Sequence, residues 1–527
     1  MSAYRREKNI AQRVIQISIA LFFLTGVAFP ILRMFARITP EKVSSLAASP
    51  QFSQALVNSL VTSFLATVVT MALSMAAAFA LERTAMKGKA FFRMLLVVPM
   101  LIPSISHAFG LVALFGTNGL VTRLLGLRSG IYGYAGIIAG SVMYAFPVAL
   151  LMFTGILRYE DASPYQAAKV LGISGRDRFF AITLPFLRKT MISVFFAVFS
   201  MIMTDYGVPL LIGGKEITLS VLMYNRAVGM LDYGQGSAIG VLLLIPAVIA
   251  FVVDVLHPED AQSAFVTTPV IPEKQGGRDL LAFCFCSLLG VFVIAPIVSF
   301  CLMVFATKYP VNPAFTLYHI EKTINRGALT YLKNSLLYAV LTGLLGTLVA
   351  FVCAYMTARV RSRFSRALHL LSMSAMAIPG LVLGLSYVIF FSGRVIYGTV
   401  VLILMVNTVH FFASPYLMMY NSLVKVNEHL EAVGRSLGIA RLRIICDVIV
   451  PKVRMTLLEM FAFFFVNSMM TISAVSFLAP PSPKPVALMI TQFEAQLLME
   501  SAAFVSVMIL LVNLVLKAAV TAVTSHK

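Results

Sequence analysis

The sequence is poor in charge: only 12% of its 527 residues are Asp, Glu, Lys or Arg, whereas 59% are hydrophobic. Soluble globular domains contain about 25% charged and about 45–50% apolar residues, so this composition excludes an ordinary soluble protein. The apolar residues form runs of roughly 20, the length at which a helix crosses the hydrocarbon core of a bilayer. In lipid only helices and closed barrels satisfy every backbone hydrogen bond, and runs this long exclude a barrel. We therefore expect an all-α integral membrane protein.

The sequence also lacks the motifs of an enzyme or a metalloprotein. The segment nearest to a phosphate-binding loop, residues 211–216, is preceded by Pro209 where the first glycine should stand, and it has no Ser or Thr after Lys215. None of the five cysteines forms a metal-type pair, because Cys284 and Cys286 would lie on divergent faces of a helix. We predict no catalytic residue, no metal site and no cofactor in this chain.

The net charge of +20 would suggest nucleic acid as the partner of a soluble protein. Here the basic residues are concentrated in alternate loops between the predicted spans, most clearly in the short loop 358–367. Short loops rich in Lys and Arg face the cytoplasm. We therefore expect a multi-pass protein in contact with membrane lipid, with both termini cytoplasmic and no nucleic-acid partner. About twelve spans are predicted, at 14–36, 53–81, 91–116, 131–157, 187–212, 237–256, 280–306, 330–357, 366–391, 396–423, 453–478 and 501–523.

An internal repeat divides the chain into two halves. Asn58-Ser59-Leu60 recurs as Asn334-Ser335-Leu336, and Ile102-Pro103 recurs as Ile378-Pro379, both 276 positions later. Leu171-Gly172-Ile173 recurs as Leu437-Gly438-Ile439, and Pro185 recurs as Pro451, both 266 positions later. Matches that keep their order indicate a duplicated unit. Six spans per half give both halves the same orientation, a parallel repeat. The predicted domains are a first module at 1–256, a cytoplasmic linker at 257–279 and a second module at 280–527.

A cytoplasmic loop of the first module, residues 158–186, has the pattern of two short helices joined by a glycine. Ser163 and Pro164 are typical of a helix start, Gln166 completes a capping box, and Gly172 suits a left-handed C-cap. A second helix would begin near Ser174 and end before Pro185. We call residues 158–186 the first elbow. The small Ala167 and Ala168, beside Leu171, would let another protein approach closely.

The second module repeats this layout in residues 424–452, the second elbow. Its corresponding positions are Glu431, Gly434, Leu437, Gly438 and Pro451. A duplicated helix–glycine–helix protrusion suits docking into clefts on a paired partner. The alternative is that both elbows are ordinary linkers carrying the positive charge of an inner loop, but the fixed Leu-Gly-Ile…Pro spacing favours docking.

These motifs carry a family resemblance. Residues 167–172, Ala-Ala-Lys-Val-Leu-Gly, followed by Ile182-Thr183-Leu184-Pro185, resemble the "EAA…G…I-x-L-P" signature of inner-membrane permease subunits of binding-protein-dependent ABC importers. Gln166 stands at the glutamate position of that signature. The second copy is more degenerate, with Glu431 adjacent to the aligned position. The fused arrangement is similar to permeases for ferric iron, 2-aminoethylphosphonate and thiamine.

The resemblance implies the fold of a type I ABC importer permease, with each elbow acting as a coupling loop. It also implies two copies of an ABC ATP-binding subunit as partners, which would hold the ATP and Mg, and a soluble or lipid-anchored solute-binding protein. The location would be the bacterial cytoplasmic (inner) membrane. The solute would be small and polar or anionic, either ferric iron or 2-aminoethylphosphonate, a sugar phosphate or thiamine.

Polar residues within predicted spans are candidates for the translocation pathway, because they usually face a bundle interior or a cavity. In the family that the chain resembles, the fifth span of each half lines the path, which points to Asp205, Tyr206, Asn467, Ser468 and Thr471. Hydrogen bonding between helices is an equally good explanation for each residue taken alone.

Two other functions stay open. An ion-coupled secondary transporter would need several carboxylates at mid-membrane, and the sequence offers very few. A membrane scaffold would give the paired elbows no purpose. We therefore expect a transport subunit that is not itself an enzyme and depends on a separate ATPase.

Overall fold

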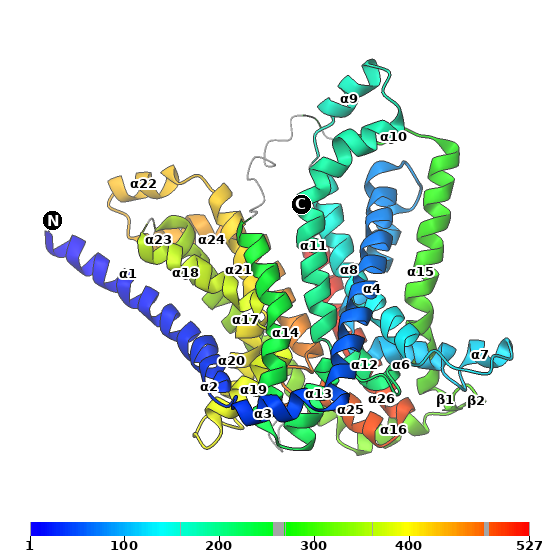
Figure 1. The fold of residues 1–527 in the computed structure, drawn as a ribbon. Coiled ribbons are helices and arrows are strands. Elements are labelled where there is room, and N and C mark those ends of the chain that lie inside the picture. The colour runs from blue at the N-terminus through cyan, green and yellow to red at the C-terminus, as the bar shows by residue number, and fades with distance from the viewer. Residues whose placement is uncertain are drawn as a thin grey trace.

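The computed structural model describes residues 2–158, 160–256, 268, 270–360, 362–478 and 484–525. These described residues form a bundle of long helices with one short β-hairpin (Figure 1). The helices of the first sequence half are α1 (Ser2–Phe23), α2 (Phe29–Phe35), α3 (Pro40–Ala47), α4 (Pro50–Arg83), α5 (Lys89–Leu95), α6 (Ser104–Phe115), α7 (Leu120–Leu124), α8 (Tyr134–Arg158), α9 (Ser163–Val170), α10 (Gly175–Arg178), α11 (Leu184–Thr204), α12 (Gly207–Ile212), α13 (Leu219–Tyr224) and α14 (Tyr233–Leu256).

The second half begins with α15 (Gly276–Val304), which starts inside the predicted linker. The strands β1 (Ala306–Lys308) and β2 (Asn312–Phe315) pair antiparallel, Ala306 opposite Phe315 and Lys308 opposite Asn312. The following helices are α16 (Tyr318–Asn325), α17 (Ala328–Arg359), α18 (Arg363–Ser374), α19 (Gly380–Phe391), α20 (Val400–His410), α21 (Ala413–Lys425), α22 (His429–Ser436), α23 (Arg441–Ile444), α24 (Val450–Met470), α25 (Ala487–Ala495) and α26 (Met499–Ser525).

The predicted membrane-spanning character is confirmed, with fewer uninterrupted spans than expected. Within the described residues, nine helices are long and apolar enough to cross a membrane, and the pair α20 and α21, bent by 56°, adds a tenth if it forms one span. The predicted spans 366–391 and 453–478 are not among them. The first is divided at Pro379, where Ile378 is extended and only the shorter apolar helix α19 follows. Proline has no N–H and forces the preceding residue out of the helical region, which explains the break.

Small side chains allow the central helices to approach closely. The longest helix, α4, buries a row of small residues, and α8 packs along it. Close backbone approach through small residues is the usual packing mode of membrane helices, because lipid offers no hydrophobic drive for association. The buried small residues of α4 are Ala55, Ser59, Thr62, Ser63, Ala66, Thr67, Thr70, Ser74, Ala77, Ala78 and Ala80.

The two sequence halves exchange their first helices. The helices α1 and α2 pack on the second half, where Tyr387 Oη donates to the Gly26 carbonyl at 2.8 Å and the Phe23 and Phe412 rings lie 4.9 Å apart. In return, α15 runs beside α4 and α6 of the first half (Figure 1). Gly110 permits this contact, since a Cβ there would stand 2.4 Å from the Pro296 carbonyl oxygen. The halves of the sequence are therefore interlocked in space.

Both elbows protrude at one end of the bundle. Figure 1 places α9 and α10 of the first elbow and α22 of the second elbow at this end, and the N and C labels also lie toward it. The opposite end carries α3, α16, α25 and the hairpin (Figure 1). The parallel repeat thus brings the two elbows to the same side, as the sequence predicted.

Candidate coupling elbows and translocation path

The first elbow has the predicted turn and differs from the prediction in its helix start. Gly172 has φ +71°, a left-handed conformation that glycine adopts without strain. Ser174 caps α10 by accepting from the Asp177 N–H at 3.2 Å. The predicted cap at Ser163 is wrong by one position: Ala162 is the N-cap of α9 and provides no side-chain bond. The Ser163 hydroxyl donates to Asp161 Oδ1 at 2.9 Å instead.

The predicted helix end before Pro185 is also wrong. Helix α10 continues through a π-helical turn, Phe179–Thr183, into α11, with Pro185 in the first turn of α11. The wider turn accommodates proline, which has no N–H to donate and would clash with the carbonyl of a regular preceding turn. The second elbow has the same arrangement, with a π-helical turn at Ile445–Ile449 before Pro451. Each elbow is therefore joined to its long helix by continuous helical backbone.

The outer surface of the first elbow is apolar and open. Val170 is 88% exposed and Leu171 76% exposed, and Gln166 and Ala167 are exposed beside them. The buried member of the motif is Ala168, which packs within the elbow. Its small size therefore serves the fold of the loop, whereas Ala167 and Leu171 stay available to a partner.

The second elbow presents the same kind of surface. Leu437 is 70% exposed, and Gly438 turns the chain at φ +74°. Gly434, the counterpart of Ala168, is buried, and a Cβ on it would stand 2.5 Å from Ile444 Cδ1. Two open apolar turns at one end of the bundle are suited to burial against another protein.

The linker contacts the first elbow. The Thr268 carbonyl accepts from the Ala162 N–H at 2.9 Å, and the Thr268 hydroxyl donates to Asp161 Oδ1 at 2.8 Å. Lys169 Nζ lies 2.7 Å from Glu273 Oε1 on the exposed side of α9. The hydrogen bond from Lys169 holds the pKa of Glu273 below its usual value. No such tether was foreseen from the sequence.

Two arginines were also missed by the sequence interpretation. Arg83 ends α4 and contacts the first elbow, and Arg359 ends α17 and contacts the second elbow. They are 276 positions apart, the same offset as the Asn-Ser-Leu and Ile-Pro repeats. This shared offset is the signal that could have found them.

The first pathway candidates lie where the fifth predicted span breaks. Asp205 follows the end of α11, and its Oδ2 accepts from the Val208 N–H at 3.0 Å, which starts α12. The Ser220 hydroxyl donates to the Asp205 carbonyl at 2.7 Å. Tyr206 is only 1% exposed, and its ring stacks on Tyr224 with centroids 5.0 Å apart. The predicted span 187–212 is therefore interrupted between α11 and α12.

The second set of candidates lies around the end of α24. Thr471 follows that helix, as Asp205 follows α11, and is 266 positions later in the sequence. Ser468 is buried and accepts from Asn407 Nδ2 at 2.9 Å, whereas Asn467 Nδ2 donates to the Phe463 carbonyl of its own helix at 2.8 Å. The structure connects the two breaks through Tyr224, whose ring stacks on Tyr206 and lies 5.9 Å from Phe477.

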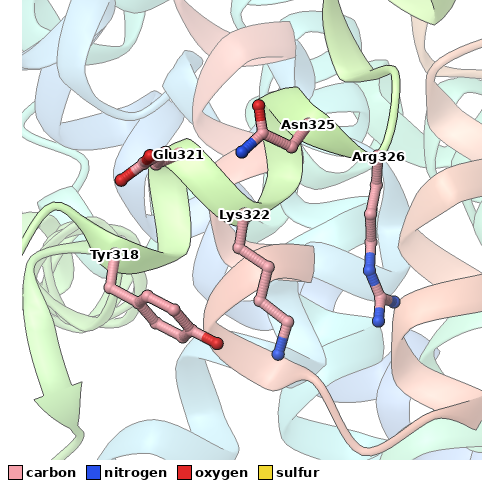
Figure 2. A pocket seen from close by; sticks show the side chains of 5 residues that line it. All are labelled: Tyr318, Glu321, Lys322, Asn325 and Arg326. Carbon is pink, nitrogen blue, oxygen red and sulfur yellow. The ribbon is translucent and has the colours of Figure 1, made fainter.

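A charged surface cavity of about 350 Å³ lies at the end opposite the elbows. It is formed by α16, with Tyr318, Glu321, Lys322, Asn325 and Arg326 along its wall (Figure 2). Arg326 Nη1 donates to Gln496 Oε1 at 2.6 Å, which ties this helix to the segment after α25. None of the predicted site residues lines this cavity.

The chain is similar to known transport proteins. The ferric transport system permease protein FbpB of Actinobacillus pleuropneumoniae is 25% identical over 502 residues, which cover 90% of this chain and 72% of that protein. The thiamine transport system permease protein ThiP of Brucella abortus (strain 2308) is 26% identical over 145 residues, covering 26% of this chain and 27% of that protein. A solved bacterial alginate ABC transporter in complex with an alginate pentasaccharide-bound periplasmic protein has a chain with a TM-score of 0.38 and 16% identity, covering 50% of this chain and 98% of its own.

The family comparison accounts for more than half of the sequence. Residues 86–258 and 343–526 each match the family described as binding-protein-dependent transport system inner membrane component. The two matches include both elbows and both pathway regions, one copy in each half of the chain. A transport subunit with a duplicated module, and not an enzyme, was the expectation from the sequence, and it is confirmed. The chain belongs to the family of inner membrane components of binding-protein-dependent transport systems, as a fused permease with two modules.

Proposed function

We propose that this chain forms the translocation path of an ATP-driven importer for ferric iron. The observation that carries the proposal is the pair of exposed elbows at one end of a duplicated bundle. The similarity to a ferric permease over 90% of the chain supports iron as the solute, because the similarity to the thiamine permease covers only 26%.

The elbows supply the docking surfaces in this proposal. Two copies of an ABC ATP-binding subunit would bury Leu171 and Leu437 and would hold the ATP and Mg. Both elbows and both termini would then face the cytoplasm of a bacterial cell. The basic residues concentrated in loops on this side support that orientation.

The opposite end would receive a soluble or lipid-anchored solute-binding protein. The charged cavity along α16 supports this placement, since it offers both signs of charge at the surface. The solute would then pass between the modules, beside Asp205 and Tyr206 on one side and Asn467, Ser468 and Thr471 on the other. The ring contacts of Tyr224 with Tyr206 and with Phe477, which follows Thr471 in the sequence, support a path between these segments.

Reconstitution in proteoliposomes tests the proposal. The chain would be purified together with a candidate ABC ATP-binding subunit, and uptake of labelled ferric iron would be measured with and without ATP and the binding protein. We expect uptake that needs all components and is not reduced by excess thiamine, 2-aminoethylphosphonate or a sugar phosphate. Competition by one of these would reassign the solute. Transport by the chain alone in an ion gradient would indicate a secondary transporter.

A further inference from the structure

Each elbow is joined to the bundle by an arginine that reaches the end of a neighbouring helix. Arg83 Nη2 donates to the Leu157 carbonyl at 3.2 Å, and Arg359 Nη2 donates to the Leu423 carbonyl at 2.7 Å. Leu157 and Leu423 are 266 positions apart and lie in the last turns of α8 and α21. Carbonyls in the last turn of a helix have no partner within it, and a cation is favourable there. The same contact therefore recurs in both modules.

In the first module the arginine also binds a carboxylate that precedes the elbow helix. Arg83 pairs with Glu160, whose side chain is 4% exposed, and the Tyr165 hydroxyl donates to the same carboxylate. The Tyr165 and Thr183 hydroxyl oxygens lie 2.6 Å apart. Glu160 thus joins the end of α4 to α9, and Tyr165 joins α9 to the π-helical turn that leads into α11.

In the second module the carboxylate has moved onto the elbow helix itself. Val426 stands at the position of Glu160, and Glu431 stands at the position of Tyr165. Arg359 Nε lies 3.6 Å from Glu431 Oε1, and Arg359 Nη2 donates to the Val426 carbonyl at 2.5 Å. Both charged side chains are nearly buried, with exposures of 6% and 12%. Both modules therefore have the arginine and its bond to the end of a neighbouring helix. The carboxylate precedes the elbow helix in the first module and lies on α22 in the second.

We infer that Arg83 and Arg359 are positioning residues that fix the two elbows to the bundle, so that each elbow moves as one body with the helices it contacts. The geometry favours this role because a planar guanidinium binds two carbonyls or a carbonyl and a carboxylate with little loss of freedom. Truncating one member of a nearly buried charge pair removes the charge interaction that offsets the burial of the other member and is costly. The transfer of force through the elbows rests on the proposed function, whereas the positioning can be measured on the chain alone.

Hydrogen exchange of the purified chain in lipid nanodiscs tests the positioning. In Arg359→Gln, the amides of residues 429–436 should exchange roughly tenfold faster, the factor that corresponds to the loss of one charge-assisted hydrogen bond. Arg443→Gln is the matched control, because Arg443 lies in the same elbow, is 77% exposed and pairs with Asp447 at 3.8 Å. Arg83→Gln should act in the same way on residues 163–170.

A triple variant of the second module, called the transplant, separates positioning from general damage to the fold. Glu431→Tyr alone should speed exchange of α22. Combining it with Val426→Glu and Ile449→Thr recreates the first module's arrangement of Glu160, Tyr165 and Thr183, and it should restore slow exchange. The same triple variant with Val426→Gln should fail to restore it, because the carboxylate is missing.

ATPase measurements add the functional readout. With the ATP-binding subunit bound, Arg359→Gln should lower the ratio of ATPase activity with binding protein to activity without it, and the transplant should recover that ratio. Unchanged exchange in Arg359→Gln would overturn the positioning. Faster exchange with an unchanged ratio would overturn a role of Arg359 in the transfer of force. If the unsubstituted chain captures no ATP-binding subunit, the proposed function fails, and the exchange rates alone decide whether the arginines position the elbows.

Discussion

Gly380 and Ser473 lie in direct contact in the second module: a Cβ on Gly380 would stand 2.6 Å from Ser473 Oγ. The first module contains the same contact with the residues exchanged. Ser104 stands at the position of Gly380, and Gly207 at the position of Ser473, and a Cβ on Gly207 would stand 2.6 Å from Ser104 Oγ. In each module the helix after the Ile-Pro break thus touches the segment after the pathway break, and one of the two residues must be glycine.

This contact predicts that a second substitution will restore the stability lost through the first. Gly207→Ser should destabilise the chain by about 1–3 kcal/mol, the usual cost of overpacking a close contact. Adding Ser104→Gly reproduces the second module's arrangement and should recover most of the loss. Thermal unfolding of the purified chain in detergent measures both. Equal stability of the single and double variants would show that the two residues do not share the contact.

The glycine turns of the elbows predict a second effect. Gly172→Val or Gly438→Val places a β-branched residue at positive φ, which costs about 1–2 kcal/mol per residue and should distort the turn. Co-purification of the ATP-binding subunit should fall, most strongly in the double variant. Gly175→Ala is the matched control, because Gly175 lies in the same elbow, is not at positive φ, and its nearest new contact would be 3.9 Å away. Unchanged capture by the double variant would contradict docking at the elbows.

The contact between linker and elbow predicts a dependence on pH. The pKa of Glu273 is lowered by its hydrogen bond and charge interaction with Lys169. A carboxylate with a lowered pKa contributes to the contact above its unperturbed value, and the contribution is lost as the pH falls through the lowered value. The contact should therefore persist from neutral pH to below the ordinary glutamate range.

Exchange of the Ala162 amide, which donates to the Thr268 carbonyl, reports on this contact. After correction for the pH dependence of chemical exchange, its protection should stay constant until the pH drops below about 4.3, the usual glutamate pKa. High salt should weaken the contact because both side chains are exposed. Lys169→Ala should reduce the pH dependence and leave the part that comes from Asp161, which accepts from the Thr268 hydroxyl and whose pKa is also lowered. An unchanged pH dependence in Lys169→Ala would exclude the Lys169–Glu273 pair as a cause.

The pathway candidates predict a separation of transport from assembly. Asp205→Asn keeps an acceptor for the Val208 N–H and removes the charge, so the start of α12 should be preserved while ferric iron uptake falls. Asn467→Ala should act in the same direction, because Asn467 belongs to the second set of candidates and bonds only to the Phe463 carbonyl of its own helix among the hydrogen bonds described. Full uptake by Asp205→Asn, with normal binding of the ATP-binding subunit, would remove Asp205 from the path.

Particular residues show how far the sequence could predict the structure. Gly172 and Gly438 end their helices in the left-handed conformation as predicted, because this constraint is local. Pro103 and Pro379 interrupt the predicted spans 91–116 and 366–391, a local effect that the span prediction did not include. The cap at Ser163 and the helix end at Pro185 were mispredicted. The first depends on Asp161 and Thr268, and the second on a π-helical turn, and neither is visible in the local pattern.

The sequence by itself determined the membrane class, the duplication and the position of both elbows, because long apolar runs, a constant offset and glycine turns are properties of the chain in order. Only the tertiary structure decided that α1 packs on the second half and α15 on the first. It also decided that Arg359 pairs with Glu431 whereas Arg83 pairs with Glu160, and that Tyr224 contacts the segments after both pathway breaks. These relationships depend on which helix faces come together, and in a chain that is apolar on most faces the sequence pattern does not distinguish one face from another.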